Sequence, residues 1–137
     1  MVEENQQLVQ RFIEEFWNQG DIDAADTYLS SDFIAWDEPL GPEGLKQVYQ
    51  FVHAAFPDLH FSVEDCFATD DRVAVRVIER GTHSGEWQGI PATGNQIAIS
   101  GTGIYRIAHG RIAQQWFHND FRTELRQLGA RIVPGEV

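Results

Sequence analysis

The chain has 137 residues, 42% hydrophobic and 23% charged, a composition typical of one globular domain with its own core. Its 21 acidic and 10 basic residues give a net charge of −11, which makes nucleic acid and anionic membrane surfaces poor partners. The single cysteine, Cys66, excludes an intrachain disulfide and a cysteine-based metal site. Residues 1–8 do not resemble a secretory signal, and no apolar run reaches the ~20 residues that span a membrane, so we expect a cytoplasmic protein.

The first 56 residues are predicted to be mainly helical. An apolar stripe at helical spacing indicates the first helix: Val9, Phe12, Ile13, Phe16 and Trp17. Residues 18–20 end it, and Asp21 can cap a second, shorter helix. After an extended segment at 32–36, the Gly-Pro-Glu sequence at 41–43 begins a third helix, which Pro57 ends.

From His60 onward the apolar period changes to two, which is typical of strands. The expected strands span residues 60–67, 73–87, 97–107 and 112–121. Short turns and one Gly/Pro loop join them, so neighbouring strands should be antiparallel. Helices followed by such strands predict an α+β fold, a single domain over residues 1–137. Long antiparallel strands curl, and the concave face then has more area than the helices cover, which leaves a pocket.

The last hairpin is predicted to form the floor of this pocket. With a tight turn at residues 109–110, Tyr105 faces Gln114 and Gly101 faces His118. Because side chains alternate along a strand, the same residues share the pocket face: Ile99, Gly101, Gly103, Tyr105, Gln114, Trp116, His118 and Asp120. The two glycines then clear space opposite Trp116 and His118. The other interpretation is a strand bend whose gap Trp116 fills.

No phosphate-binding loop or nucleophile elbow is present, and the histidines lack metal-ligand spacing. An iron site of His83, His118 and Asp120 stays as an alternative, but we expect neither metal nor cofactor. The remaining chemistry is proton transfer. A carboxylate in an aromatic pocket loses hydration and its pKa rises, so we expect Asp120 to be the catalytic acid/base, with His118 orienting or protonating the substrate.

Other polar residues allow two interpretations each. Arg76 lies in an otherwise apolar strand, where it can point inward to stabilise an enolate oxygen or form a salt bridge on the outer face. Glu79 and Arg80 are expected at a solvated strand end. His83 is expected at the surface or with its hydrogen bonds satisfied.

Several motifs now identify a relative. They are GPEGL (41–45), AAFPDL (54–59), DRVAVR (71–76), GTHSGEW (81–87), GIPATG (89–94), GRIAQQW (110–116) with Asp120, and LRQLG (125–129). In order and spacing the chain resembles the SnoaL-like polyketide cyclases. The resemblance implies an NTF2-like cone, in which three N-terminal helices pack on a strongly curved, antiparallel or mixed sheet around a pocket. It also implies frequent dimers and a cofactor-free intramolecular aldol ring closure of an aromatic polyketide ester, with the acid/base aspartate at Asp120.

The chain differs from many family members at two positions. Trp36 stands where many have histidine, and Gly103 where many have a polar residue, often aspartate. Both changes make the pocket less polar or roomier. We expect the ligand to be small and hydrophobic or aromatic. The residues expected to bind it are Trp36, Arg76, Gly101, Gly103, Tyr105 and Trp116.

The sequence therefore favours a cofactor-independent acid/base enzyme that acts on a hydrophobic carbonyl compound by aldol cyclisation or isomerisation. One alternative is a binding protein without catalysis. Another is an epoxide-opening hydrolase, which needs Asp120, Asp37 and Arg76 to converge on a water molecule. A homodimer is also expected, formed through an outer sheet face that carries Ile104 and Phe117.

Overall fold

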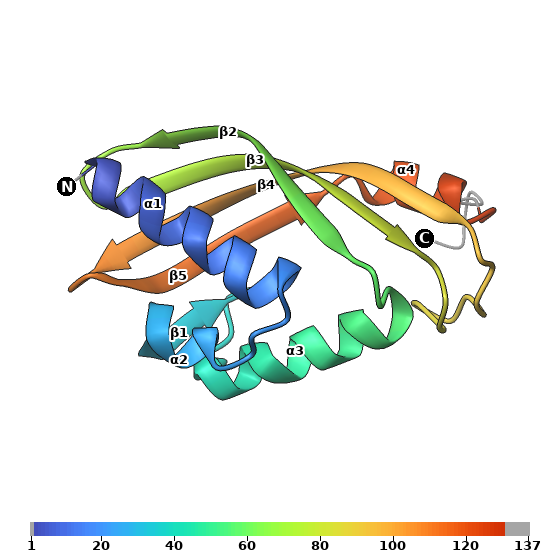
Figure 1. Cartoon of the computed structure of the whole chain (residues 1–137), viewed down its shortest axis with the longest axis horizontal. Coiled ribbons are helices and arrows are strands. Elements are labelled where there is room, and N and C mark those ends of the chain that lie inside the picture. The colour runs from blue at the N-terminus through green and yellow to red at the C-terminus, as the bar shows by residue number, and fades with distance from the viewer. Residues whose placement is uncertain (1, 131–137) are drawn as a thin grey trace.

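A five-stranded sheet curves around the helices in the computed structural model, which describes residues 2–130 (Figure 1). Its strands lie in the order β1-β5-β4-β3-β2. Their bounds are Leu29–Ala35 for β1, His60–Ala68 for β2, Arg72–Thr82 for β3, Gln96–Ala108 for β4 and Arg111–Asn119 for β5. β1 pairs with β5 in parallel and the other neighbours are antiparallel. The predicted α+β cone on a mixed, curved sheet is confirmed.

The helices cover the concave face. They are α1 (Val2–Phe12), the π-helical segment η1 (Ile13–Asn18), α2 (Ala24–Tyr28), α3 (Gly41–Ala55) and α4 (Phe121–Gln127). The apolar stripe predicted for the first helix is buried along its whole length, from Val9 to Trp17. Its second half is wound as a π-helix, and α4 was not predicted at all. None of the helices within residues 2–130 has the length and apolar character needed to cross a bilayer.

Two polar side chains hold the helical layer against the sheet. The amide of Asn18 donates to the Phe61 carbonyl and accepts from the Phe61 N–H, at 2.9 and 2.8 Å, which joins η1 to β2. The Arg111 guanidinium donates to the main-chain oxygens of residues 26, 27 and 29, which joins the end of α2 to β5. The space between helices and sheet is therefore fixed at both ends.

The β4–β5 hairpin differs from its predicted register by one residue. The tight turn at His109 and Gly110 is present, with φ of 54° and 73°. Ile107 pairs with Ile112, but Arg106 pairs with Gln114, so Ala113 is an extra residue in a bulge.

The bulge exchanges the two faces of β5 beyond it. Gln115, Phe117 and Asn119 therefore pair with Tyr105, Gly103 and Gly101, and the predicted pocket-facing positions of Gln114, Trp116 and His118 are wrong. The prediction that Phe117 lies on the outer face is wrong for the same reason.

Candidate functional site

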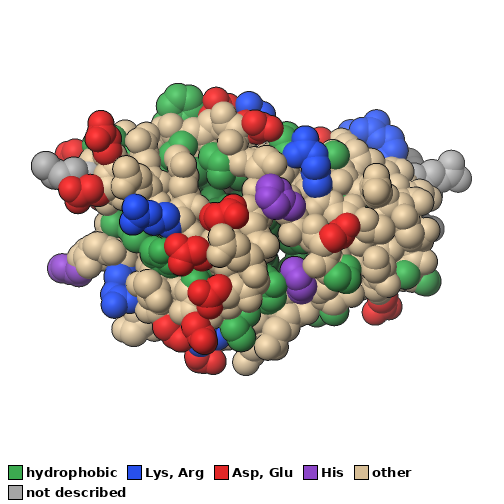
Figure 2. Space-filling model, viewed as in Figure 1, with side chains coloured by type: hydrophobic (Ala, Val, Ile, Leu, Met, Phe, Trp, Pro, Cys, Tyr) green, Lys and Arg blue, Asp and Glu red, His purple; other side chains and the backbone are tan. Residues whose placement is uncertain are grey.

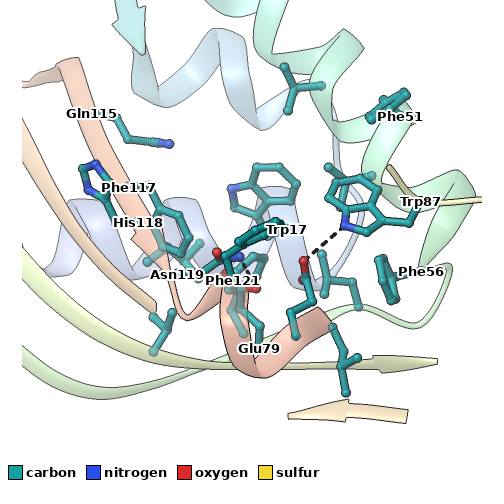
Figure 3. Close-up of a pocket in the computed structure, with 18 of the residues that line it drawn as sticks. Trp17, Phe51, Phe56, Glu79, Trp87, Gln115, Phe117, His118, Asn119 and Phe121 are labelled. Carbon is teal, nitrogen blue, oxygen red and sulfur yellow. Dashed lines mark hydrogen bonds between the residues drawn. The ribbon is translucent and has the colours of Figure 1, made fainter. Parts of the chain in front are cut away.

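A cavity of about 550 Å³ lies between η1, α3 and the concave face of the sheet (Figure 3). Its wall is rich in aromatic side chains from the helices, the sheet and the connecting loops: Trp17, Phe51, Phe56, Phe61, Trp87, Phe117 and Phe121. Ile13 and Trp17 project into it from the π-helical segment, a type of helical irregularity that is frequent at functional sites. The pocket predicted from the curved sheet is present.

Glu79 is the polar centre of this pocket. It lies on β3 between its cross-strand neighbours Phe61 and Ile99, and only 6% of the residue is exposed. The pKa of its carboxyl is raised to about 7, mainly by loss of hydration and to a smaller extent by the nearby charge of Glu124. The amide of Asn119 donates to Glu79 Oε2 at 3.4 Å, and this hydrogen bond lowers the pKa of Glu79 because it stabilises the charged carboxylate. Glu79 can therefore give or accept a proton near neutral pH.

A second carboxylate, Glu124 of α4, is also buried in the cavity wall, with 4% exposed. The indole N–H of Trp87 donates to Glu124 Oε1 at 3.2 Å (Figure 3). Burial raises the pKa of Glu124, and the Trp87 hydrogen bond partly offsets this rise. The pocket thus contains two carboxylates, one in the sheet and one in the helix after it.

Gly101 and Gly103 do face the cavity side of the sheet, but the side chains that use the space differ from those expected. A Cβ on Gly101 would lie 2.7 Å from Phe117 Cζ and 3.3 Å from Glu79 Oε1. A Cβ on Gly103 would lie 3.1 Å from Phe117 Cδ2 and 3.2 Å from the Tyr105 hydroxyl. The glycines therefore make room for Phe117, Glu79 and Tyr105, and not for Trp116 and His118.

Asp120 lies outside the cavity wall, although Asn119 and Phe121 on either side of it are part of that wall. β5 ends at Asn119, and Asp120 caps α4: its carboxylate accepts from the backbone N–H and the hydroxyl of Thr123, at 3.2 and 2.6 Å. Both hydrogen bonds lower the pKa of Asp120, and the bond from the Thr123 hydroxyl has the larger effect. The prediction that Asp120 stands in an apolar pocket with a raised pKa is wrong.

Two predicted ligand-binding residues lie on the opposite face of the sheet. Arg76 is exposed and forms a salt bridge with Asp65 at 2.6 Å, so the outer-face alternative holds. Trp116 also faces outward, and the guanidinium of Arg72 lies 5.9 Å from the centre of its ring. Neither side chain can touch a ligand in the cavity.

The remaining predicted residues line the pocket. Tyr105 is in its wall. His118 pairs with Thr102 and so does not face the cavity from β5, but it borders the exposed edge of the pocket beside Phe117 (Figure 3). Trp36 lines the mouth with 50% of its surface exposed and a left-handed backbone, φ 53°. That conformation is strained for a bulky residue.

Neither the alternative iron site nor the epoxide-opening site is formed by the residues expected for it. His83 is fully buried, with Nδ1 beside the Thr93 hydroxyl at 2.9 Å and Nε2 unpaired, so the expectation of a surface or fully satisfied histidine is wrong. His118 is exposed and Asp120 caps a helix. No group of three or more His, Cys, Asp or Glu that could hold a metal ion occurs within residues 2–130. Asp37 is exposed at the turn after β1, and Arg76 is on the far face, so the epoxide-opening arrangement is also wrong.

The sequence interpretation missed Glu124, Asn119 and Gln115, and its placement of Glu79 at a solvated strand end is wrong. For Glu79 a signal was available: it continues the two-residue period of Val73, Val75 and Val77, which are all buried. Glu124 had no such signal, because α4 was not predicted. Asn119 and Gln115 became pocket residues through the bulge at Ala113.

Comparison with known proteins decides the family. The model of the SnoaL-like polyketide cyclases matches residues 7–128. The chain belongs to the SnoaL-like polyketide cyclase family. The resemblance inferred from its motifs is thus confirmed. No curated protein matches this SnoaL-like sequence.

Several solved structures share the whole SnoaL-like fold. AclR from Streptomyces galilaeus, described as a hydroxylase candidate, is 26% identical with a TM-score of 0.82, and 94% of this chain and 98% of AclR are covered. TsrD from Streptomyces laurentii is 28% identical with a TM-score of 0.85, and 93% of this chain and 96% of TsrD are covered. IdmH from Streptomyces antibioticus, described as a polyketide cyclase candidate, is 32% identical with a TM-score of 0.77, and 88% of this chain and 95% of IdmH are covered.

Proposed function

We propose that this SnoaL-like protein is a cofactor-independent acid/base enzyme that acts on a hydrophobic carbonyl compound, with Glu79 transferring the proton. The observation that carries the proposal is the Glu79 carboxyl, buried in an aromatic cavity with its pKa raised to about 7. A catalytic acid/base works best when its pKa is near the operating pH, because both protonation states are then available.

The proposed reaction starts with removal of a proton from the carbon next to the substrate carbonyl. The Glu79 carboxylate takes the proton, the C–H electrons form a C=C bond, and the carbonyl π electrons move to oxygen to give an enolate. In a ring closure, the enolate carbon bonds to a second carbonyl carbon of the same molecule, and the new alkoxide takes the proton from Glu79. In an isomerisation, Glu79 returns the proton to a different carbon. Neither route needs an oxidant or reductant.

The pocket suits a flat, uncharged substrate. Aromatic walls pack well against planar rings, and the volume of about 550 Å³ is within the usual range for small-molecule sites. The net charge of −11 disfavours anionic ligands. An aromatic polyketide ester, the substrate class that the family resemblance implies, has this character.

Asp120 is the alternative acid/base, because the family motif falls on it. Its exposed carboxylate and lowered pKa make it a weaker base than Glu79. His118, at the pocket edge, is proposed to orient the outer end of the substrate.

Proton exchange separates these roles without knowledge of the natural substrate. The probe is 2-tetralone, a bicyclic ketone, whose α-proton exchange in D₂O is followed by proton NMR. We expect the wild type to accelerate exchange over buffer, and Glu79→Gln to lose about 100-fold or more of that acceleration. Asp120→Asn, which keeps a capping side chain, is the matched control and should stay within about threefold of wild type.

The opposite pattern, loss in Asp120→Asn and retention in Glu79→Gln, would transfer the role to Asp120. Binding of 2-tetralone without any acceleration by the wild type would favour the binding protein without catalysis.

A further inference from the structure

The pocket contains two polar groups that the protein itself leaves unbonded. Tyr105 and Gln115 line the cavity and are 3% and 4% exposed. They are direct cross-strand partners on β4 and β5. Gln115 Oε1 is buried without a hydrogen-bond partner, and no hydrogen bond within residues 2–130 engages the Tyr105 hydroxyl. Figure 3 shows the Gln115 side chain reaching toward the interior of the pocket.

The unbonded Gln115 Oε1 is also buried away from water, which destabilises the fold and calls for an explanation. Aliphatic or phenyl side chains of similar size would fill the same positions without that cost. A ligand hydroxyl would donate to Gln115 Oε1, and a ligand oxygen would accept from the Tyr105 hydroxyl. The arrangement is thus better suited to recognition than to folding.

The two glycines of β4 set the position of the Tyr105 hydroxyl relative to Glu79. The hydroxyl lies 3.2 Å from the Cβ position of Gly103, and Glu79 Oε1 lies 3.3 Å from the Cβ position of Gly101. Gly101 and Gly103 are successive positions on one face of β4. The hydroxyl and the carboxylate therefore face the same stretch of the cavity.

Tyr105 is suited to be a hydrogen-bond donor. Burial raises its pKa above the ordinary tyrosine value, and the charge of Glu79 raises it further. The phenol therefore keeps its proton at neutral pH and can donate it in a hydrogen bond.

We propose that Tyr105 and Gln115 form an oxygen-binding subsite, in which the Tyr105 hydroxyl donates to the substrate's carbonyl oxygen and Gln115 Oε1 accepts from a hydroxyl substituent nearby. The enolate part of this role rests on the proposed function of Glu79: when the carboxylate removes the α-proton, negative charge develops on the oxygen and the Tyr105 hydrogen bond becomes stronger. The substrate class is thus a flat hydrophobic ketone with a further hydroxyl group at the end that enters the pocket.

Binding of two probes of similar shape tests the subsite independently of catalysis. Equilibrium dialysis measures the Kd of 2-naphthol, which has an oxygen, and of 2-methylnaphthalene, which has none. The wild type should prefer 2-naphthol by about 10-fold, the factor that one good hydrogen bond gives. Tyr105→Phe and Gln115→Leu should each reduce this preference to about threefold or less and leave the affinity for 2-methylnaphthalene unchanged.

Tyr28→Phe is the matched control, because the Tyr28 hydroxyl donates to Glu15 and lies outside the cavity. It should keep the wild-type preference. A thermal melt separates binding from folding roles: Gln115→Leu removes an unpaired buried oxygen, so its Tm should be equal to or higher than that of the wild type. A lower Tm with an unchanged probe preference would assign Gln115 to the fold alone.

The subsite is overturned if the wild type shows no preference for 2-naphthol, or if both pocket variants retain it. Glu79→Gln distinguishes the two proposals, since it should lose proton exchange and keep the 2-naphthol preference. If exchange never depends on Glu79 while the preference depends on Tyr105, the proposed catalytic function fails and the oxygen-binding subsite stands.

Discussion

Two carboxylates near one pocket differ because of their surroundings. Glu79 has lost its hydration and has one amide donor, so its pKa rises to about 7. Asp120 accepts two hydrogen bonds from Thr123 at an exposed helix start, so its pKa falls. The residue type and sequence neighbourhood favoured Asp120, and only the contacts distinguish the two.

The neighbours of Glu79 should control the pH dependence of activity. The carboxylate is the active form, so 2-tetralone exchange should rise with pH through about 7. Asn119→Ala removes a hydrogen bond to the charged form and should move this rise to higher pH. Glu124→Gln removes a negative charge near Glu79 and keeps an acceptor for Trp87. It should therefore move the rise in exchange rate to lower pH.

The measurement is the pH–rate profile of each variant. Shifts in the same direction, or no shift in either variant, would contradict the role of Glu79 as the titrating group. Asp120→Asn provides the reference, since it should leave the profile where it is.

At the scale of elements, a single bulge explains most of the difference between the expected and the observed site. The turn at His109-Gly110 and the β4 face are readable from the sequence, because a left-handed turn and strict alternation both leave a residue pattern. Nothing in the sequence around Ala113 marks an extra residue, because Ile112 and Ala113 are both apolar and either could take the inward position. The fold was therefore predictable, whereas the identity of the β5 side chains in the pocket was not.

The turn after β1 is a second element with a local cost. Ala35 and Glu38 exchange backbone hydrogen bonds of 3.1 and 2.9 Å, and the two residues between them, Trp36 and Asp37, both have positive φ. Such turns favour asparagine or glycine. Trp36 nevertheless occupies this position and lines the mouth of the pocket, where we expect its ring to contact the ligand.

Trp36→Asn should therefore raise the stability of the protein and weaken ligand binding. Relief of the left-handed strain contributes about 1 kcal/mol, partly offset by the lost packing of the half-exposed ring. Urea unfolding and the Kd of 2-methylnaphthalene are the two measurements. Asp37→Gly is the control, because it relaxes the same turn outside the cavity wall and should leave the Kd unchanged. An unaltered Kd in Trp36→Asn would remove Trp36 from the binding site.

At the scale of the whole molecule, the two sides differ in charge and polarity. Acidic side chains are spread over the side that carries α1 and α2 (Figure 2). The outer face of the sheet instead carries four arginines at outward positions, Arg72, Arg76, Arg80 and Arg106. It also exposes Phe67 and Ile104, by 67% and 42%. Two copies meeting through this face would bury the exposed apolar surface of Phe67 and Ile104.

We expect a homodimer formed through this outer face, with Ile104 near its centre and Trp116 beside it. Sedimentation equilibrium should give twice the 15.6 kDa of the chain, and Ile104→Lys should shift the species to the monomer. Gln10→Lys on exposed α1 introduces the same charge on the helical side and should leave the dimer intact. A monomeric wild type would refute the dimer, and a dimeric Ile104→Lys variant would locate the interface elsewhere.

The glycines at 101 and 103 also have a consequence for selectivity between positions on one substrate. The oxygen donor and the proton acceptor each lie across one glycine, and same-face positions on a strand are about 6.6 Å apart. The main chain of β4 therefore sets how far the reacting carbon stands from the anchored oxygen. Substitutions in the aromatic walls would change which molecules enter the pocket. The substrate carbon that loses its proton would stay the same unless the Tyr105 hydroxyl or the Glu79 carboxylate moved to another strand position.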